Sequence, residues 1–321
     1  MRCHEPALRP SDFRHCANRP GEYSCRTLMF SVRQIDSLDL PELSPYRTLK
    51  RPAEHAAQGI FVAEGDKVVR RLLASRFGVV SLLLPDKRLA EFEPLLRARP
   101  EPEIPVYVAG GKSILEELIG FEMFQGVLAV GKIPDAPTLE QALAASPRPR
   151  LLAAMDELNN AENIGLLVRN CAAFGAQALL VGETSSSQFL RRAVRNSMGA
   201  IFQLPVVELG QQRSPLADPG KPRRRDEPGV TLAGTLRELR ARGIRSIAAH
   251  PPAGGRTLAQ ADFTGDCCII FGSEGRGISE SVLAACDEAV AIPMANGVDS
   301  LNVGAAAAVF LYEARRQRNQ A

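Results

Sequence analysis

The sequence predicts an α/β protein with a small N-terminal domain and a larger domain built on a mostly parallel sheet with helices on both faces. Two features indicate this class. Short apolar runs of strand length alternate with segments of helical periodicity along most of the chain. A chain of 321 residues with 45% hydrophobic residues is also long and apolar enough for two buried cores.

The N-terminal segment 1–30 lacks periodicity, so we expect a disordered leader there; a start at Met29 is the alternative. The chain has seven cysteines, and this odd number favours reduced thiols. The cysteines and histidines of the leader do not have the spacing of a usual zinc site, and we expect no metal. These residues are Cys3, His4, His15, Cys16 and Cys25.

Residues 31–131 are predicted to form the first domain, because strand-like and helix-like segments alternate there. Apolar runs such as VVSLLLP suit buried strands, whereas DKVVRRLLAS places its apolar residues at helical spacing. The predicted strands are 59–65, 79–85, 104–110 and 124–131, and the predicted helices are 66–75, 89–98 and 113–120.

Residues 132–149 are predicted to be a linker. Prolines open and close it around a short helical stretch, TLEQALAAS. This density of proline favours an extended connector.

The second domain, 150–321, begins with a βαβ unit of about 30 residues, whose helix should end at Gly175 as a C′ residue. Residues 210–229 are rich in proline, glycine and charge, and we expect a mobile loop. The predicted strands are 150–156, 176–182, 201–208, 244–250, 267–272 and 288–292, and the predicted helices are 163–174, 187–198, 235–243, 279–286 and one that starts near Asn302.

The charge distribution is more informative than the net charge of +3, which by itself is weak evidence for a nucleic-acid partner. Arg191, Arg192 and Arg195 cluster on one predicted helix, and four more cations lie at 221–225. A solvated face is the ordinary interpretation of such clusters. No apolar run has the roughly 18–20 residues of a spanning helix, and the N-terminal segment has charges but no apolar h-region of a secretory signal, so we expect a cytoplasmic protein.

A polar loop near the C-terminus leads into a helix that begins with small residues, GAAAA. Small side chains let another backbone approach closely. Ser300 and Asn302 flank the apolar Leu301, and their polar groups need partners if they are buried with it. The combination suits a tight pocket for a small polar ligand; an N-cap role is the alternative for Ser300.

Segment 155–176, MDELNNAENIGLLVRNCAAFGA, places Arg169 among small residues on one helical face. This pattern suggests that something large docks over the arginine, and a surface salt bridge is the alternative. Asn163 stands where the helix should begin, so an N-cap role could explain it.

Segment 267–279, CCIIFGSEGRGIS, places three glycines between a buried strand and a helix. A tight turn would explain them structurally. A phosphate-binding loop is disfavoured, because the glycine order is not that of dinucleotide-binding folds and Glu274 would repel a pyrophosphate. A neutral or cationic ligand suits this turn better.

Together, in this order and at these spacings, the three segments resemble the signature motifs of SpoU-type (TrmH-like) RNA 2′-O-ribose methyltransferases, members of the knotted SPOUT superfamily. The resemblance covers about residues 150–318. A weaker match at about 40–130 resembles the small ribosomal-protein-like domain that precedes many such catalytic domains. The knot is implied by the resemblance alone.

The resemblance implies methyl transfer from S-adenosylmethionine to a ribose 2′-hydroxyl of RNA without a metal, by a homodimer. The separate N-terminal domain, implied to bind the substrate, favours ribosomal RNA. Arg169 is assigned to phosphate binding and positioning, because a guanidinium gives up its proton reluctantly. The implied catalytic residues are Asn163, Arg169, Glu274, Ser300 and Asn302, and the cofactor would be held around Gly272, Gly277, Ile292, Met294 and Leu301.

Three alternatives stay open. The substrate could be transfer RNA. The chain could be a non-catalytic RNA-binding assembly factor, although the intact set of motif residues argues against it. A nucleotide-dependent oxidoreductase is disfavoured by the glycine order. For Arg191, Arg192 and Arg195 we predict contacts with RNA phosphates, with a dimer interface as the alternative.

Overall fold

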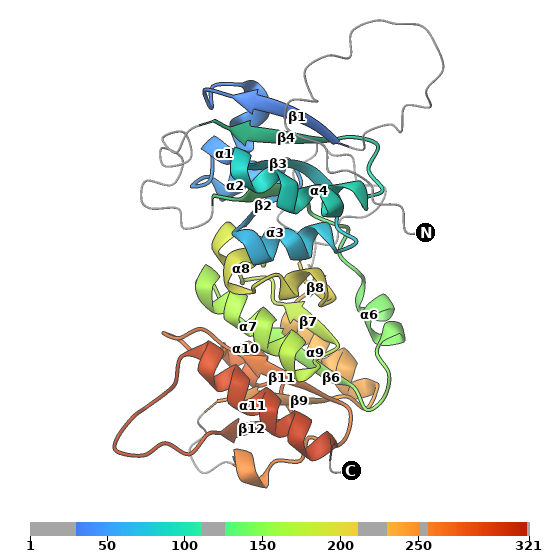
Figure 1. Cartoon of the computed structure of the whole chain (residues 1–321). Coiled ribbons are helices and arrows are strands. Elements are labelled where there is room, and N and C mark those ends of the chain that lie inside the picture. The colour runs from blue at the N-terminus through green and yellow to red at the C-terminus, as the bar shows by residue number, and fades with distance from the viewer. Residues whose placement is uncertain (1–29, 111–125, 211–229, 251–255, 320–321) are drawn as a thin grey trace, which may run out of the picture.

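The computed structural model describes residues 30–110, 126–210, 230–250 and 256–319. The predicted leader up to residue 29, the helix at 113–120 and nearly all of the loop at 210–229 lie outside these ranges. Two sheets, of five and seven strands, organise the rest. Figure 1 shows them one above the other, with α3 (Asp66–Leu73) and α8 (Arg191–Asn196) between them.

The first sheet is mixed and has the order β1-β4-β3-β5-β2. Strands β1, β4 and β3 are parallel, and β5 is antiparallel to both β3 and β2. The four predicted strands are all present. The bounds are β1 (Phe30–Ile35), β2 (Ile60–Glu64), β3 (Val79–Pro85), β4 (Ile104–Ala109) and β5 (Leu128–Lys132).

Strand β1 was not predicted, because only its two end residues are buried and its sequence FSVRQI therefore has little apolar patterning. It lies at the edge of the sheet and pairs with a single neighbouring strand, β4. Three short helices before β2 were also missed: η2 (Pro41–Leu43), α1 (Ser44–Arg47) and α2 (Pro52–Ala57). Tyr46 of α1 is fully buried, and its hydroxyl lies 2.8 Å from the hydroxyl of Ser81 on β3.

The second sheet is parallel at every described strand pair and has the order β10-β12-β9-β11-β6-β7-β8. The predicted, mostly parallel sheet is thus confirmed. The bounds are β6 (Leu151–Met155), β7 (Ala178–Val181), β8 (Val206–Glu208), β9 (Arg245–Ala249), β10 (Arg256–Thr257), β11 (Cys267–Phe271) and β12 (Glu288–Ala291).

Helices cover both faces of this sheet. In β11, Cys267 and Ile269 belong to the core on one side, whereas Cys268 and Ile270 belong to the core on the other. The first core contains α7 (Ala161–Phe174) and α11 (Val303–Arg318), and the second contains α6 (Leu139–Ala145), α9 (Leu232–Ala241) and α10 (Glu280–Leu283).

Two predicted segments have a different form in the structure. The short helical stretch predicted inside the linker is present as α6, capped by Thr138, but α6 buries Ala142 and Leu143 in the second core, so the linker is packed against the second unit and is not an extended connector. The predicted helix 187–198 is the six-residue α8, and the predicted strand 201–208 is a 3-10 turn followed by β8. Gly199, at a φ of 81°, separates α8 from that turn.

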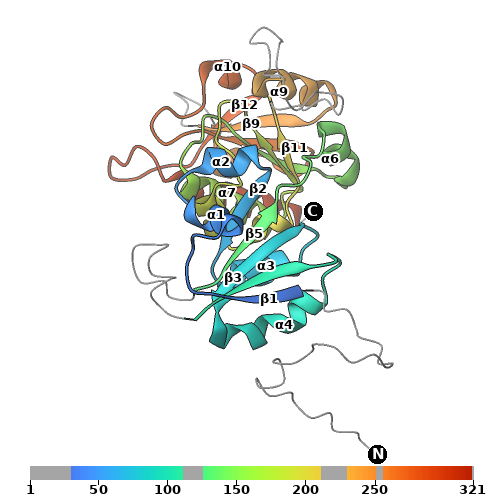
Figure 2. The same ribbon diagram turned by 90° about the horizontal axis from the view of Figure 1, so that it is seen from above.

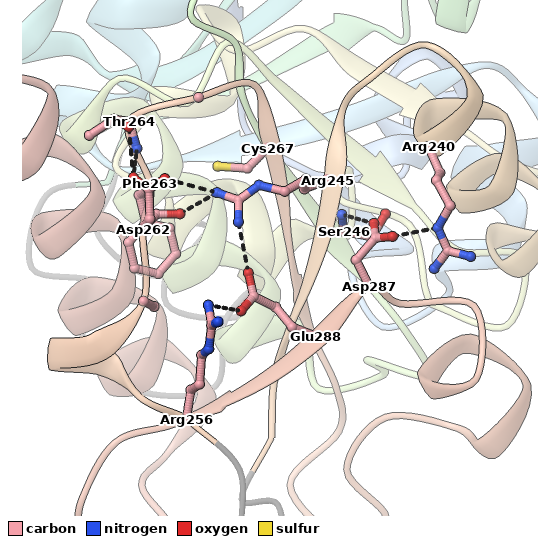
Figure 3. A network of polar contacts seen from close by, with 12 residues as sticks. Arg240, Arg245, Ser246, Arg256, Asp262, Phe263, Thr264, Cys267, Asp287 and Glu288 are labelled. Carbon is pink, nitrogen blue, oxygen red and sulfur yellow. Dashed lines mark hydrogen bonds and ion pairs between the residues drawn. The ribbon is translucent and has the colours of Figure 1, made fainter.

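Ion pairs and hydrogen bonds connect the starts of β9 and β12 at one edge of the second sheet (Figure 3). Arg245 donates to Glu288 at 3.1 Å, and Arg256 donates to the other oxygen of that carboxylate at 3.3 Å. Asp287 accepts a 2.7 Å hydrogen bond from the backbone of Ser246 and pairs with Arg240. These contacts fix the strand starts, and the loops that follow the strands emerge from the opposite edge.

One continuous apolar core joins the two units. At the junction, the ring of Phe61 on β2 is stacked on that of Phe189, with centroids 5.3 Å apart, and Phe77 and Phe202 complete the cluster. Such contacts are worth more than the buried area alone. Within the described ranges, no helix has the length and apolarity needed to cross a bilayer.

Candidate active site

The candidate site lies at the carboxyl edge of the second sheet. Strands β6, β9, β11 and β12 are parallel, so the loops that follow them leave at the same edge. Strands β7 and β8 follow β6 on one side of it, and β9, β10, β11 and β12 all lie on its other side. The order of the strands therefore reverses between β6 and β11. Ligands of open parallel sheets bind at such a point. All three sequence segments singled out above meet there.

Helix α7 is capped by Asn160, not by Asn163. The Asn160 side chain accepts hydrogen bonds from the backbone N–H groups of Glu162 and Asn163, at 2.9 and 3.3 Å. The predicted N-cap role of Asn163 is therefore wrong, because the helix begins one turn earlier in the run NNAEN. Asn163 is instead a helical residue, 6% exposed, whose side chain is available for other contacts.

Asn302 connects the third segment to the first. Its Nδ2 donates a 2.9 Å hydrogen bond to Oδ1 of Asn163, and its Oδ1 accepts a 2.9 Å hydrogen bond from the backbone of Gly304. The second contact makes Asn302 the N-cap of α11, so the alternative N-cap role for Ser300 is wrong. Ser300 lies in the exposed loop before the helix.

Helices α7 and α11 approach each other closely where α11 begins. A Cβ atom added at Gly304 would lie 2.9 Å from Cβ of Leu166, closer than real Cβ atoms come. Asn170 donates a 2.6 Å hydrogen bond to the Gly304 carbonyl. The predicted close approach over small residues is therefore confirmed, and the neighbour is α7.

The arginine of the first segment remains accessible. A Cβ atom at Gly165 would lie 2.5 Å from the Ala193 carbonyl, so α8 of the same chain covers the small residue on that face of α7. Arg169 is exposed, and among the described residues its guanidinium has neither a hydrogen bond nor an ion pair. The alternative interpretation, a surface salt bridge, is therefore not supported, because Arg169 has no carboxylate partner among the described residues.

The glycine segment forms a very tight turn. Ser273 and Gly277 exchange two backbone hydrogen bonds of 2.9 Å, and Gly277 has a φ of 72°. A Cβ atom at Gly272 would lie 2.2 Å from the carbonyl carbon and oxygen of Gly277. Both glycines are thus required by the turn itself, as the structural alternative predicted. Glu274 is exposed at its tip.

Sequence reasoning missed Asp156, which holds this turn in place. Asp156 is 3% exposed and directly follows β6, and its Oδ2 accepts a 2.8 Å hydrogen bond from the backbone of Ser279. An acidic residue immediately after a fully apolar strand was the available signal. His250, after β9, was also missed; an added Cβ at Gly277 would lie 3.7 Å from its Nδ1.

The loop from Pro293 to Ser300 is exposed along its whole length. Met294 and Leu301 are 37% and 38% exposed, and Ile292 is partly buried. Exposed apolar side chains beside a polar loop offer surface that a ligand or another chain can cover.

The arginine cluster lies at the junction of the two units. Arg195 pairs with Glu64 of β2 at 2.6 Å, and Arg191 pairs with the other oxygen of the same carboxylate. The Arg192 side chain is 68% exposed and lies 3.9 Å from Glu162. Two of the three predicted RNA contacts are therefore engaged within the chain. The cations at 221–225 lie outside the described residues.

The environment of the cysteines in the second unit disfavours thiolate formation: Cys171, Cys267 and Cys268 are buried, and Cys286 is partly buried. Burial raises the pKa of Cys171 and of Cys286 to about 12, and it also raises that of Cys268. Thiols with such pKa values stay protonated at neutral pH and cannot serve as nucleophiles. Among the described residues, no three His, Cys, Asp or Glu side chains gather as a metal site would require.

The chain is similar to several known proteins. The model of the SpoU rRNA Methylase family matches residues 150–219 and 229–312. An uncharacterized tRNA/rRNA methyltransferase of Mycobacterium tuberculosis is 32% identical over 293 residues, which is 89% of this chain and 92% of the relative. A relative of the same description from Mycobacterium avium is 34% identical over 209 residues, covering 64% of this chain and 60% of its own.

Solved structures are similar over most of both chains. The SpoU methyltransferase AviRb from Streptomyces viridochromogenes, in complex with the cofactor AdoMet, is 26% identical with a TM-score of 0.67, covering 87% of this chain and 98% of its own. A putative RNA methyltransferase of the TrmH family from Porphyromonas gingivalis is 25% identical with a TM-score of 0.64, covering 85% and 96%.

Proposed function

Because this chain belongs to the SpoU rRNA methylase family, we propose that it transfers a methyl group from S-adenosylmethionine to a ribose 2′-hydroxyl of RNA. The observation that carries the proposal is the hydrogen bond between Asn302 and Asn163. It joins the first and third segments at the sheet edge from which the glycine turn also leaves, where a parallel sheet binds its ligands. The AdoMet complex of AviRb supports the choice of methyl donor.

The residues at this edge fit S-adenosylmethionine. The donor supplies its methyl group on a positively charged sulfonium. A carboxylate such as that of Glu274 tolerates this charge, as it would not tolerate a pyrophosphate. The exposed side chains of Met294 and Leu301 offer apolar surface that an adenosine would cover. The backbone of Gly272, Gly277 and Ile292 is assigned to the same ligand.

The chain's own residues would act by positioning. Asn163 and Asn302 join the starts of α7 and α11. Ser300 and Asn302 would face the reacting ribose, and Glu274 would help to steady the nucleophile. Holding two reactants in line is worth about 7–11 kcal/mol of the barrier. The guanidinium of Arg169, which has no partner among the described residues, would bind a substrate phosphate. A guanidinium is poorly suited to act as a base, so positioning is its more reasonable role.

Ribosomal RNA is the favoured substrate, and transfer RNA is the alternative. The unit at 31–131 is joined through 132–149 to the catalytic unit at 150–321. It would bind structured RNA, mainly by recognising the shape and the 2′-hydroxyl groups of the RNA. A knotted C-terminal segment and a homodimer belong to the same proposal. Val309 and Tyr312 of α11 are exposed apolar positions that a second copy could cover.

Two measurements test the proposed function. Calorimetry of the protein with S-adenosylmethionine should give a heat of binding. No heat even at high cofactor concentration would favour a non-catalytic RNA-binding factor. Mapping of 2′-O-methylation in total RNA from cells with and without the protein should then identify one missing ribose methyl group. An identical map in both would contradict the assigned reaction.

A further inference from the structure

A cleft of about 350 Å³ lies between the two units, on the side where the first unit faces α7. Both Figure 1 and Figure 2 show α2 and β2 at this junction. One wall comes from Leu49 to Ile60 of the first unit, and the other comes from Ser187 to Arg192 of the second. Ala161, the first residue of α7, also lines the cleft.

The chemistry of the lining combines an apolar floor with a cationic rim. The floor includes Leu49, Ile60 and the ring of Phe189. Lys50, Arg191 and Arg192 supply the charge, and no carboxylate lines the cleft among the described residues. An apolar surface with an aromatic ring suits a nucleobase, and cations beside it suit a phosphate.

The charge of the rim is only partly neutralised. Glu64 is shared between Arg191 and Arg195, so one carboxylate faces two guanidinium groups. Lys50 is exposed and has no side-chain partner within the ranges that the structure describes. Arg192 is mostly exposed and lies 3.9 Å from a single carboxylate. The rim therefore retains net positive charge.

His55 shapes the wall but does not add charge. Its Nε2 lies 3.0 Å from both the Pro45 carbonyl and the Thr48 hydroxyl. Burial lowers the pKa of this histidine, which favours the neutral ring. These contacts fix its position in the wall of the cleft.

The cleft is adjacent to the candidate active site. Ala161 precedes Asn163 by two residues on α7, about 3 Å along the helix axis, but the two side chains are turned about 200° from each other around it. Ala161 faces the cleft on the α8 side of the helix, whereas Asn163 faces the start of α11. An RNA strand in the cleft would therefore reach Asn163 by passing over the first turn of α7. A group held here would lie near the reacting nucleotide without being that nucleotide.

We propose that this cleft binds one unpaired nucleotide of the RNA substrate, next to the methylated one, with its base against Phe189 and its phosphate at Lys50 and Arg192. The inference rests on the proposed function. The volume lies near the lower end of the roughly 300–1,000 Å³ of small-molecule sites, which suits one nucleotide and excludes a duplex. Both units would then contribute residues to RNA binding at this cleft.

The absence of tryptophan from the chain gives a direct test. In Phe189→Trp the single indole reports on the cleft, and a ten-nucleotide single-stranded RNA of mixed sequence should quench its emission. Ala90→Trp, at an exposed position of α4 (Leu89–Arg97) outside the cleft lining, is the matched control and should not respond. Ala56→Trp, on the exposed wall of the cleft, replaces the first variant if that one is unstable.

A second variant tests the cationic rim. Lys50→Ala/Arg192→Ala should lower RNA affinity about tenfold or more, as expected for two charge-assisted hydrogen bonds. The slope of log K against log salt should fall by about 0.7 for each phosphate that the variant no longer neutralises. Lys87→Ala removes an exposed lysine of the same unit that does not line the cleft, and it should leave both quantities unchanged.

The outcomes separate this inference from the proposed function. If the wild type methylates RNA but the indole in the cleft is not quenched and the rim variant binds RNA normally, the cleft inference is overturned and the function stands. If the indole is quenched and the rim variant is weakened while S-adenosylmethionine gives no heat, the cleft binds an unpaired nucleotide, but the proposed reaction fails and so does the placement of that nucleotide beside a methylated one.

Discussion

The hydrogen bond between Asn302 and Asn163 can be tested by replacing the two asparagines with aspartate, singly and together. Either asparagine can be replaced by aspartate while the hydrogen bond is kept, because the remaining amide can still donate to the new carboxylate. Asn302→Asp also keeps the oxygen that caps α11, where a negative charge is favourable by about 0.3–1 kcal/mol. Each single variant should therefore unfold within about 1 kcal/mol of the wild type.

The double variant Asn163→Asp/Asn302→Asp has no donor between the two side chains. Two negative charges 2.9 Å apart, the distance of the present hydrogen bond, repel each other by about 1.4 kcal/mol at a dielectric constant of 80 and by about 6 kcal/mol at 20. Because Asn163 is only 6% exposed, the cost should lie between these limits. The coupling free energy of the double-mutant cycle should thus exceed about 1.4 kcal/mol.

The double variant should also depend on pH. Repulsion raises the folded-state pKa of one carboxyl above its unfolded value of about 3.9, so the folded state binds the extra proton. The stability deficit should therefore be smallest below about pH 4 and grow as pH rises through the raised pKa. Urea unfolding, followed by circular dichroism at pH 4 and pH 7, measures both effects. Additive free energies for the two substitutions, independent of pH, would refute the contact.

Three further perturbations test other parts of the site. Gly272→Ala should cost about 2 kcal/mol or more in urea unfolding and weaken S-adenosylmethionine binding, because its Cβ would collide with the turn backbone; Gly275→Ala, whose Cβ meets open space, should be nearly neutral. Glu64→Gln should lower the free energy of unfolding by about 1–3 kcal/mol. This is less than for a fully buried ion pair, because the Arg195 side chain is 59% exposed. An unchanged unfolding midpoint would show that the junction of the two units does not depend on this ion pair. Arg169→Ala should reduce methyl transfer more than tenfold with an unchanged melting temperature, since the side chain has no partner among the described residues; full activity would remove its assigned role.

The regular elements of the second sheet could be predicted because their information is local. Strands such as CCIIF are continuous apolar runs, as a sheet buried on both faces requires. The helix end at Gly175 was equally legible, and the structure gives that residue a φ of 81°. Strand β1 could not be found in this way, because it lies at a sheet edge and buries too few side chains to leave a pattern.

Contacts between distant residues could not be predicted. Sequence placed the arginines of α8 on one helix, but it could not show that Glu64, 131 positions before Arg195, would share its carboxylate between two of them. The cleft beside them likewise requires both units to be folded and docked. The cap of α7 was misplaced by one turn, because several asparagines compete for it and only the folded backbone decides among them.

By itself, the sequence determined the α/β class, the parallel sheet and the three segments that carry the family resemblance, since periodicity and short motifs are properties of neighbouring residues. Only the tertiary structure decided which of these side chains meet. Asn163 and Asn302 are 139 positions apart and become hydrogen-bonded only because α7 and α11 pack on the same face of the sheet. Such pairings depend on the packing of whole elements, which no local pattern encodes.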